Sequence, residues 1–174
     1  MLRHTLALCA ALTLPLSSLA ASTSCTEDAM IVFDGSGSMA EMGFNQIDEP
    51  RIFEARRAVR RAVPDIATVR RLGLIVYGPG AETSCANIDL RFAPRWQADG
   101  PIISAVEHLQ PAGETPLTAS VQRAAEVLDY RNRSGAIVLV TDGKETCGGA
   151  PCVLAAELAA EAVDLTVHVI GYKV

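Results

Sequence analysis

Three short runs of apolar residues most constrain what this chain can fold into. They are Met30–Phe33, Leu72–Tyr77 and Ala136–Val140. A run without polar alternation predicts a strand that is buried on both faces, which is typical of a parallel sheet covered by helices. Stretches with helical spacing separate these runs. The chain therefore predicts an α/β fold with helices on both faces of a mostly parallel central sheet.

The remaining segments complete this alternation of strands and helices. We expect helices over Arg51–Ile66, Pro101–Leu109, Pro116–Leu128 and Pro151–Ala162, an edge strand returning as a hairpin over Ile88–Phe92, and a last strand over Leu165–Ile170. This order is typical of a Rossmann-like, doubly wound sheet. Ligands of such sheets bind outside the carboxyl ends of the strands, where the strand order reverses.

Oxygen-bearing side chains gather at those predicted strand ends. Asp34, Ser36 and Ser38 follow the first strand, Asp142 follows the third, and Thr115 lies in a loop before a helix. The glycines between Asp34 and Ser38 allow a tight turn and a close approach of the backbone. Carboxylates and hydroxyls, without sulfur or imidazole, suit a hard cation such as Mg²⁺. The sequence therefore predicts a metal site at this edge of the sheet.

Three motifs together resemble the von Willebrand factor type A domain and its metal-ion-dependent adhesion site. They are Asp34-Gly35-Ser36-Gly37-Ser38, Gly113-Glu114-Thr115-Pro116-Leu117 and Thr141-Asp142-Gly143. The likeness covers residues 28–174. A full domain of this family usually continues with another helix and strand, so the resemblance implies a C-terminally shortened form or a fragment.

The resemblance also implies how the site works. Ser36 and Ser38 would coordinate Mg²⁺ through their hydroxyls, Thr115 directly or through water, and Asp34 and Asp142 through bound waters. Mn²⁺ and Ca²⁺ are alternatives to Mg²⁺. An acidic residue of a partner protein would fill the open coordination position. The implied function is metal-dependent protein binding, in adhesion or scaffolding, rather than catalysis.

Residues 1–20 have the features of a secretory signal peptide. A basic start, an apolar stretch over Leu6–Leu16 and the small-residue context Ser18-Leu19-Ala20 follow one another. The apolar stretch is short and interrupted for a membrane span, so a cleaved leader is the main expectation and an uncleaved anchor is the alternative. We therefore expect a periplasmic or secreted protein with no membrane span after cleavage. With a formal net charge of −5, nucleic acid is a poor partner.

Four cysteines follow the predicted leader, and an even number in an exported chain favours disulfides. Four cysteines allow three connectivities. The turn-rich loop between Cys147 and Cys152 favours local closure, and Cys25 with Cys85 then follows by elimination.

Two other functions are compatible with parts of the sequence. The fold could be a disulfide-bonded structural domain whose metal site no longer functions. A serine hydrolase would need Ser36 or Ser38 as nucleophile and His108 or His168 as base. The Gly-Ser-Gly-Ser context is not the Gly-x-Ser-x-Gly elbow of hydrolases, so we expect a protein that is not an enzyme.

Overall fold

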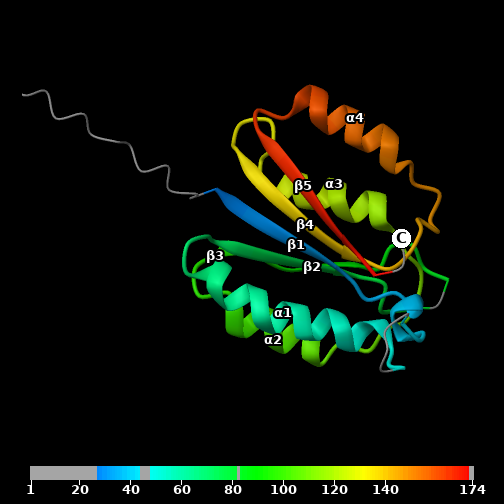
Figure 1. Cartoon of the computed structure of the whole chain (residues 1–174). Coiled ribbons are helices and arrows are strands. Elements are labelled where there is room, and N and C mark those ends of the chain that lie inside the picture. The colour runs from blue at the N-terminus through cyan, green and yellow to red at the C-terminus, as the bar shows by residue number, and fades with distance from the viewer. Residues whose placement is uncertain (1–26, 44–47, 82, 173–174) are drawn as a thin grey trace, which may run out of the picture.

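A five-stranded sheet forms the centre of the protein (Figure 1). The computed structural model describes residues 27–43, 48–81 and 83–172. The strands are β1 (Asp28–Asp34), β2 (Leu72–Tyr77), β3 (Ile88–Arg95), β4 (Gly135–Thr141) and β5 (Leu165–Gly171). They lie in the order β3-β2-β1-β4-β5, with β3 antiparallel to β2 and the other pairings parallel. The predicted α/β fold with a mostly parallel sheet is confirmed.

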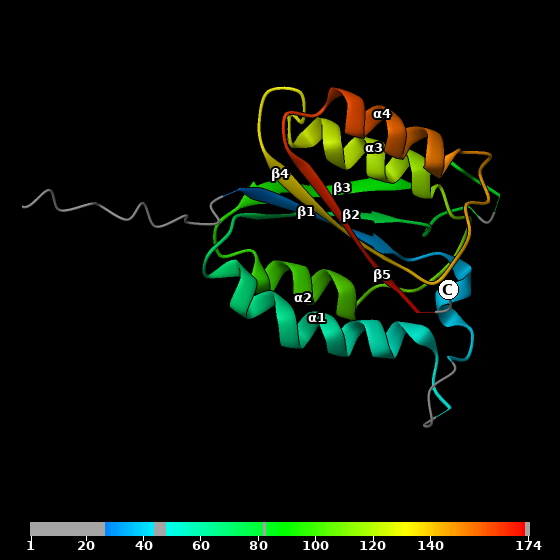
Figure 2. The same ribbon diagram turned by 45° about the horizontal axis from the view of Figure 1, so that its top comes forward.

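Two layers of helices enclose this sheet (Figure 2). The helices are α1 (Arg51–Ala67), α2 (Asp99–Glu107), α3 (Leu117–Val127) and α4 (Pro151–Glu161), and a short 3-10 helix, η1 (Gly37–Ala40), follows β1. Helices α1 and α2 cover one face, and α3 and α4 cover the other. No helix in the described part of the chain is long and apolar enough to cross a membrane. The predicted leader, residues 1–20, lies outside the described residues.

Strand β1 is buried on both faces, which explains its unbroken apolar sequence. Ile31 and Phe33 pack in the core beneath α1 and α2, whereas Met30 and Val32 pack in the core beneath α3. Phe33, Met30 and Val32 are completely buried. Burying a side chain of this size stabilises the fold by roughly 1.5–3 kcal/mol. The central strand is therefore a rigid base for the polar residues that follow it.

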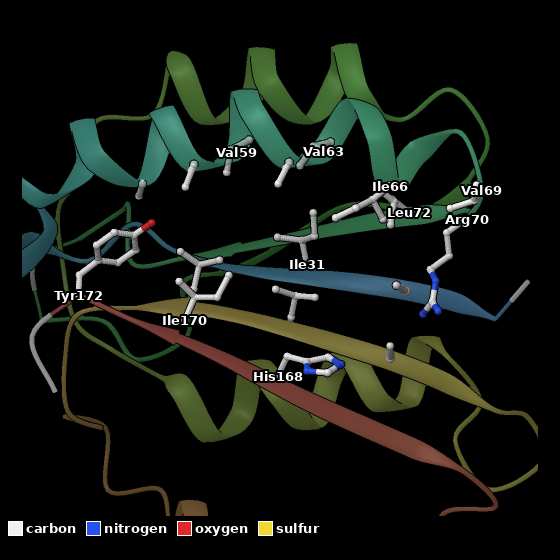
Figure 3. A pocket seen from close by; sticks show the side chains of 17 residues that line it. Ile31, Val59, Val63, Ile66, Val69, Arg70, Leu72, His168, Ile170 and Tyr172 are labelled. Atoms are coloured by element: carbon white, nitrogen blue, oxygen red, sulfur yellow. The ribbon is translucent and has the colours of Figure 1, made fainter. Parts of the chain in front are cut away.

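The helix cover is incomplete at β5. An apolar groove of about 460 Å³ runs between α1 and the β4–β5 side of the sheet. Figure 3 shows Val59 and Val63 of α1 facing Ile170 and His168 of β5 across this groove, with Tyr172 at one end. Ile170 is 44% exposed. Helices thus cover both faces of the sheet, as predicted, and leave the side of β5 that faces this groove partly uncovered.

Both predicted disulfide pairings are wrong. The structure joins Cys85 to Cys147, and Cys152 is a free, exposed thiol. Cys25 lies outside the described residues. Cys85 is in the loop between β2 and β3, and Cys147 is in the loop between β4 and α4. Because β2 and β4 are parallel to β1, the loops that follow them lie at the same end of the sheet, so the disulfide links two loops distant in sequence.

Replacing both Cys85 and Cys147 by serine should lower the free energy of unfolding. The bond spans 62 residues, and the chain-entropy account gives about 4 kcal/mol for a loop of this length. We expect a loss of roughly 2–4 kcal/mol in urea denaturation. Cys152→Ser is the matched control and should unfold like the wild type. A disulfide between Cys147 and Cys152 in non-reducing peptide mass mapping would contradict this arrangement.

Candidate functional site: a cluster of oxygen ligands at the carboxyl edge of the sheet

Asp34 ends β1 and its carboxylate is completely buried. Its Oδ1 accepts a hydrogen bond from the backbone N–H of Ser36 at 2.8 Å. Its Oδ2 accepts a hydrogen bond from the Thr141 hydroxyl at 2.7 Å. Since a buried carboxylate is costly unless it is hydrogen-bonded, these two bonds explain how the chain holds Asp34 in the interior. They also fix the orientation of both carboxylate oxygens.

A buried tyrosine extends this hydrogen-bond chain. The Tyr77 hydroxyl donates to Thr141 Oγ1 at 3.2 Å, and Thr141 in turn donates to Asp34. Burial, and next the negative charge of Asp34, raise the pKa of Tyr77 far above its ordinary value. Tyr77 therefore stays a neutral donor and fixes the direction of the Thr141 hydroxyl. Sequence reasoning missed Tyr77, which lies opposite Asp34 in the parallel pairing of β1 with β2.

The two serines connect Asp34 to the second carboxylate. Ser36 Oγ and Ser38 Oγ lie 3.1 Å apart, and Ser38 Oγ donates to Asp142 Oδ1 at 2.7 Å. Ser36 and Asp142 are buried. The turn into η1 brings both hydroxyls to the same side, so they face the end of β4. The predicted residues of these two loops therefore meet in space.

Thr115 faces the same small volume from a third loop. It is 4% exposed. A Cβ atom built on Gly143 would lie 3.4 Å from Ser38 Oγ and 3.9 Å from Thr115 Oγ1, so both hydroxyls point to the space beside this glycine. Thr146 holds the loop: the Thr115 N–H donates to Thr146 Oγ1 at 2.8 Å, and the Thr146 N–H donates to the Thr115 carbonyl at 3.2 Å.

A buried arginine also belongs to this cluster, and sequence reasoning missed it. Arg51, the first residue of α1, is 3% exposed. One guanidinium nitrogen, Nη1, donates to Asp142 Oδ2 at 2.5 Å and to the Ser38 carbonyl at 2.9 Å. Asp142 therefore accepts from Ser38 on one oxygen and from Arg51 on the other. In the sequence, Arg51 is one of several arginines in the same predicted helix, so nothing indicated that its side chain is buried.

Glu145 fixes the loop after β4 to the start of α3. Helix α3 has Pro116 at its N-cap and no side-chain cap of its own. Glu145 Oε2 accepts from the Thr118 N–H at 2.8 Å, and Oε1 accepts from the Cys147 N–H at 2.7 Å. Glu145 thus satisfies a free N–H at the start of this helix from a distant loop, as a capping residue does.

The donor set fits a hard divalent cation. Carboxylates and neutral hydroxyls of Asp34, Ser36, Ser38, Thr115 and Asp142 offer oxygen ligands, which Mg²⁺ and Mn²⁺ accept. Within the described residues, no group of three or more His, Cys, Asp or Glu side chains is placed to hold a metal. Cation binding here would therefore depend on the hydroxyls.

The histidines that a serine hydrolase would need as general base lie away from Ser36 and Ser38. The ring of His108, at the end of α2, is exposed and lies 2.8 Å from the Ser104 carbonyl. His168 lines the apolar groove beside α1. In the described part of the chain, neither histidine joins the hydrogen bonds of Ser36 or Ser38.

Residues 29–145 match the von Willebrand factor type A domain. This match covers more than half of the chain and includes the strands and loops that carry the cluster. The chain belongs to the von Willebrand factor type A domain family. Domains of this family are generally modules for protein interaction rather than enzymes.

The chain is similar to several known proteins at low sequence identity. YwmD of Bacillus subtilis (strain 168), an uncharacterized protein, is 28% identical over 166 residues, which are 90% of this chain and 72% of YwmD. Manganese-loaded TRAP protein of Plasmodium vivax has a TM-score of 0.62 at 18% identity, covering 86% of this chain and 59% of TRAP. Proximal thread matrix protein 1 from the mussel byssus, with a zinc-occupied MIDAS motif, has a TM-score of 0.54 at 19% identity. The match covers 84% of this chain and 38% of the mussel protein.

These structural likenesses show a shared fold. This chain spans less than two thirds of either solved relative. Both solved relatives carry a metal: manganese in TRAP, and zinc in the MIDAS motif of the mussel protein.

Thr141→Val should destabilise the protein. The substitution keeps the shape of the side chain but leaves Asp34 Oδ2 and the Tyr77 hydroxyl without their partner. An unsatisfied buried polar group costs about 1–3 kcal/mol, so we expect a loss of that size in urea denaturation with chelator present. Thr166→Val, at an exposed position of β5, is the control. Equal stability of the two variants would show that Thr141 does not hold Asp34.

Because Glu145 stabilises the fold only while it is ionised, the domain should lose stability as the pH falls. Desolvation, the largest influence, raises the pKa of Glu145, but hydrogen bonds from Thr118, Cys147 and Gly149 together lower it below its ordinary 4.5. A carboxylate whose pKa is lower in the folded state stabilises the fold above its unfolded pKa, and this contribution is lost as the pH falls through the folded pKa.

The test is the pH dependence of thermal unfolding below about pH 4.5, the ordinary pKa of this side chain. We expect Glu145→Gln to lose less stability than the wild type over that range, after starting from a lower value at neutral pH. Glu157→Gln, on the exposed side of α4, should follow the wild type. If Glu145→Gln also followed it, the helix-capping role would be wrong.

Proposed function

We propose that Asp34, Ser36, Ser38, Thr115 and Asp142 hold a divalent cation, with Mg²⁺ the natural choice and Mn²⁺ or Ca²⁺ as alternatives. The observation that carries this proposal is the continuous network from Asp34 through Ser36 and Ser38 to Asp142, with Thr115 facing the same space. Residues that serve only to form a turn rarely have their hydroxyls buried against carboxylates, because a buried polar group needs a specific hydrogen-bond partner.

The roles of these residues follow from their hydrogen bonds. Ser38 donates its proton to Asp142 and accepts a hydrogen bond from Ser36 Oγ, so one lone pair of its oxygen remains to bind a cation. Asp34 is held by Ser36 and Thr141, which suits a carboxylate that orients waters around a cation. When bound, Mg²⁺ keeps several waters and supplies a position that can accept a carboxylate in exchange.

We further propose that this domain is an exported protein-binding module for adhesion or scaffolding. Its partner would present an Asp or Glu side chain to the cation. Export is supported by the signal-peptide pattern of residues 1–20 and by the disulfide between Cys85 and Cys147. The protein would be periplasmic or secreted, with residues 28–174 as its binding domain, and it would not be an enzyme.

A second candidate function is a structural domain whose metal site no longer works. The ion pair between Arg51 and Asp142 favours this alternative, because a guanidinium already balances one of the two carboxylates. The two functions differ in one property: only the first requires measurable affinity for a divalent cation.

Calorimetric titration with Mg²⁺ and Mn²⁺ separates these functions. We expect the wild type to bind one cation and Ser38→Ala to bind it roughly 10–100-fold more weakly, as for other changes around metal sites. Ser104→Ala, at an exposed position of α2, is the matched control and should bind like the wild type. A wild-type protein without affinity for either cation would contradict the proposal and leave the structural alternative.

A further inference from the structure

We propose that Arg51 is a positioning residue that tunes the charge of the cation site. In this account, which rests on the proposed function, Arg51 weakens the binding of the divalent cation and strengthens the subsequent binding of an anionic group by the loaded site. The two effects have opposite signs because the same fixed positive charge repels the cation and attracts the anion.

The position of Arg51 carries the first step. Its Nη1 contacts Asp142 Oδ2 at 2.5 Å and the Ser38 carbonyl at 2.9 Å, and Glu41 Oε2 lies at 3.3 Å. The side chain of Arg51 is 3% exposed and that of Asp142 is fully buried, whereas that of Glu41 is 63% exposed. The guanidinium charge therefore acts on Asp142 with little screening by solvent.

Stability alone does not account for this burial. The Arg51 Nε–H is buried without a hydrogen-bond partner among the described residues. An unsatisfied buried donor is destabilising, and a buried ion pair often contributes less than apolar residues of similar volume would. The buried charge of Arg51 beside Asp142 therefore indicates a role in the proposed cation site.

Counting charges gives the direction of both effects. Among the buried side chains of the cluster, Asp34 and Asp142 supply two negative charges, and Arg51 offsets one of them; Glu41 is left out of this count because its side chain is 63% exposed and solvent screens its charge. A divalent cation would leave the cluster with one positive charge in excess, whereas without Arg51 the loaded cluster would be neutral. A positive loaded cluster attracts a carboxylate, which agrees with the partner proposed above.

The main test compares Mn²⁺ titrations of the wild type, Arg51→Gln, Arg51→Lys and Arg60→Gln. Arg60 lies on the same helix and pairs with Glu107 at an exposed position, so its variant changes the net charge equally, away from the site. We expect Arg51→Gln to bind Mn²⁺ at least about tenfold more tightly, which corresponds to about 1.4 kcal/mol. Arg51→Lys should stay within about threefold of the wild type, and Arg60→Gln should match it.

A purely structural role for Arg51 predicts the opposite sign. Loss of a structural anchor would disorder Ser38 and Asp142, so Arg51→Gln would bind Mn²⁺ more weakly. Equal or weaker binding by this variant overturns the inference while leaving the proposed function intact. A wild-type protein that binds no Mn²⁺ overturns the proposed function, and the inference with it.

Two further measurements keep the inference testable if Arg51→Gln does not fold in chelator. Millimolar Mn²⁺ should then restore the wild-type circular dichroism, because the cation replaces the missing positive charge; no recovery would overturn the inference.

The second measurement uses acetate as the carboxylate probe, with relaxation of its methyl protons by protein-bound Mn²⁺. Arg51→Lys should keep the wild-type acetate relaxation. If a folded Arg51→Gln also kept it, the effect on anions would be wrong.

Discussion

The parallel pairing of β1 with β4 is the constraint on which the rest of the structure depends. Phe33 lies opposite Val140 in this pairing, so the residues that follow both strands leave the sheet side by side. Asp34 thereby comes within hydrogen-bond distance of Thr141, and Asp142 follows directly. Because the apolar residues of β1 are fixed by the core on both faces, the polar residues beyond it have little freedom to rearrange.

The loops around this point stabilise one another. Thr146 holds the Thr115 loop, Glu145 caps α3, and the adjacent Cys147 is bonded to Cys85. Five oxygen-bearing side chains from three loops are thus supported by neighbouring backbone and side-chain contacts. Side chains held in place in this way lose little further entropy on binding, which agrees with the cation site proposed above.

Much of the fold, and the close placement of the candidate site residues, could be predicted from the sequence, since both depend on simple rules. Apolar runs identify buried strands, and parallel strands bring their carboxyl ends to one edge, so Asp34 and Asp142 could be placed together without coordinates. The features that sequence reasoning missed depend on contacts between distant positions. Arg51 pairs with a residue 91 positions away, and nothing in the spacing of α1 distinguishes it from exposed arginines. The predicted cysteine pairing was wrong because the short separation in sequence favoured Cys147 with Cys152. In the fold, the sheet instead brings the loop that carries Cys85 next to Cys147.

The central claim is that these side chains surround a divalent cation. The most direct test is an anomalous difference map from a crystal soaked in MnCl₂. The account predicts one strong peak bounded by the hydroxyls of Ser36, Ser38 and Thr115. A map without a peak there, with those hydroxyls still bonded only to their protein neighbours, would contradict it.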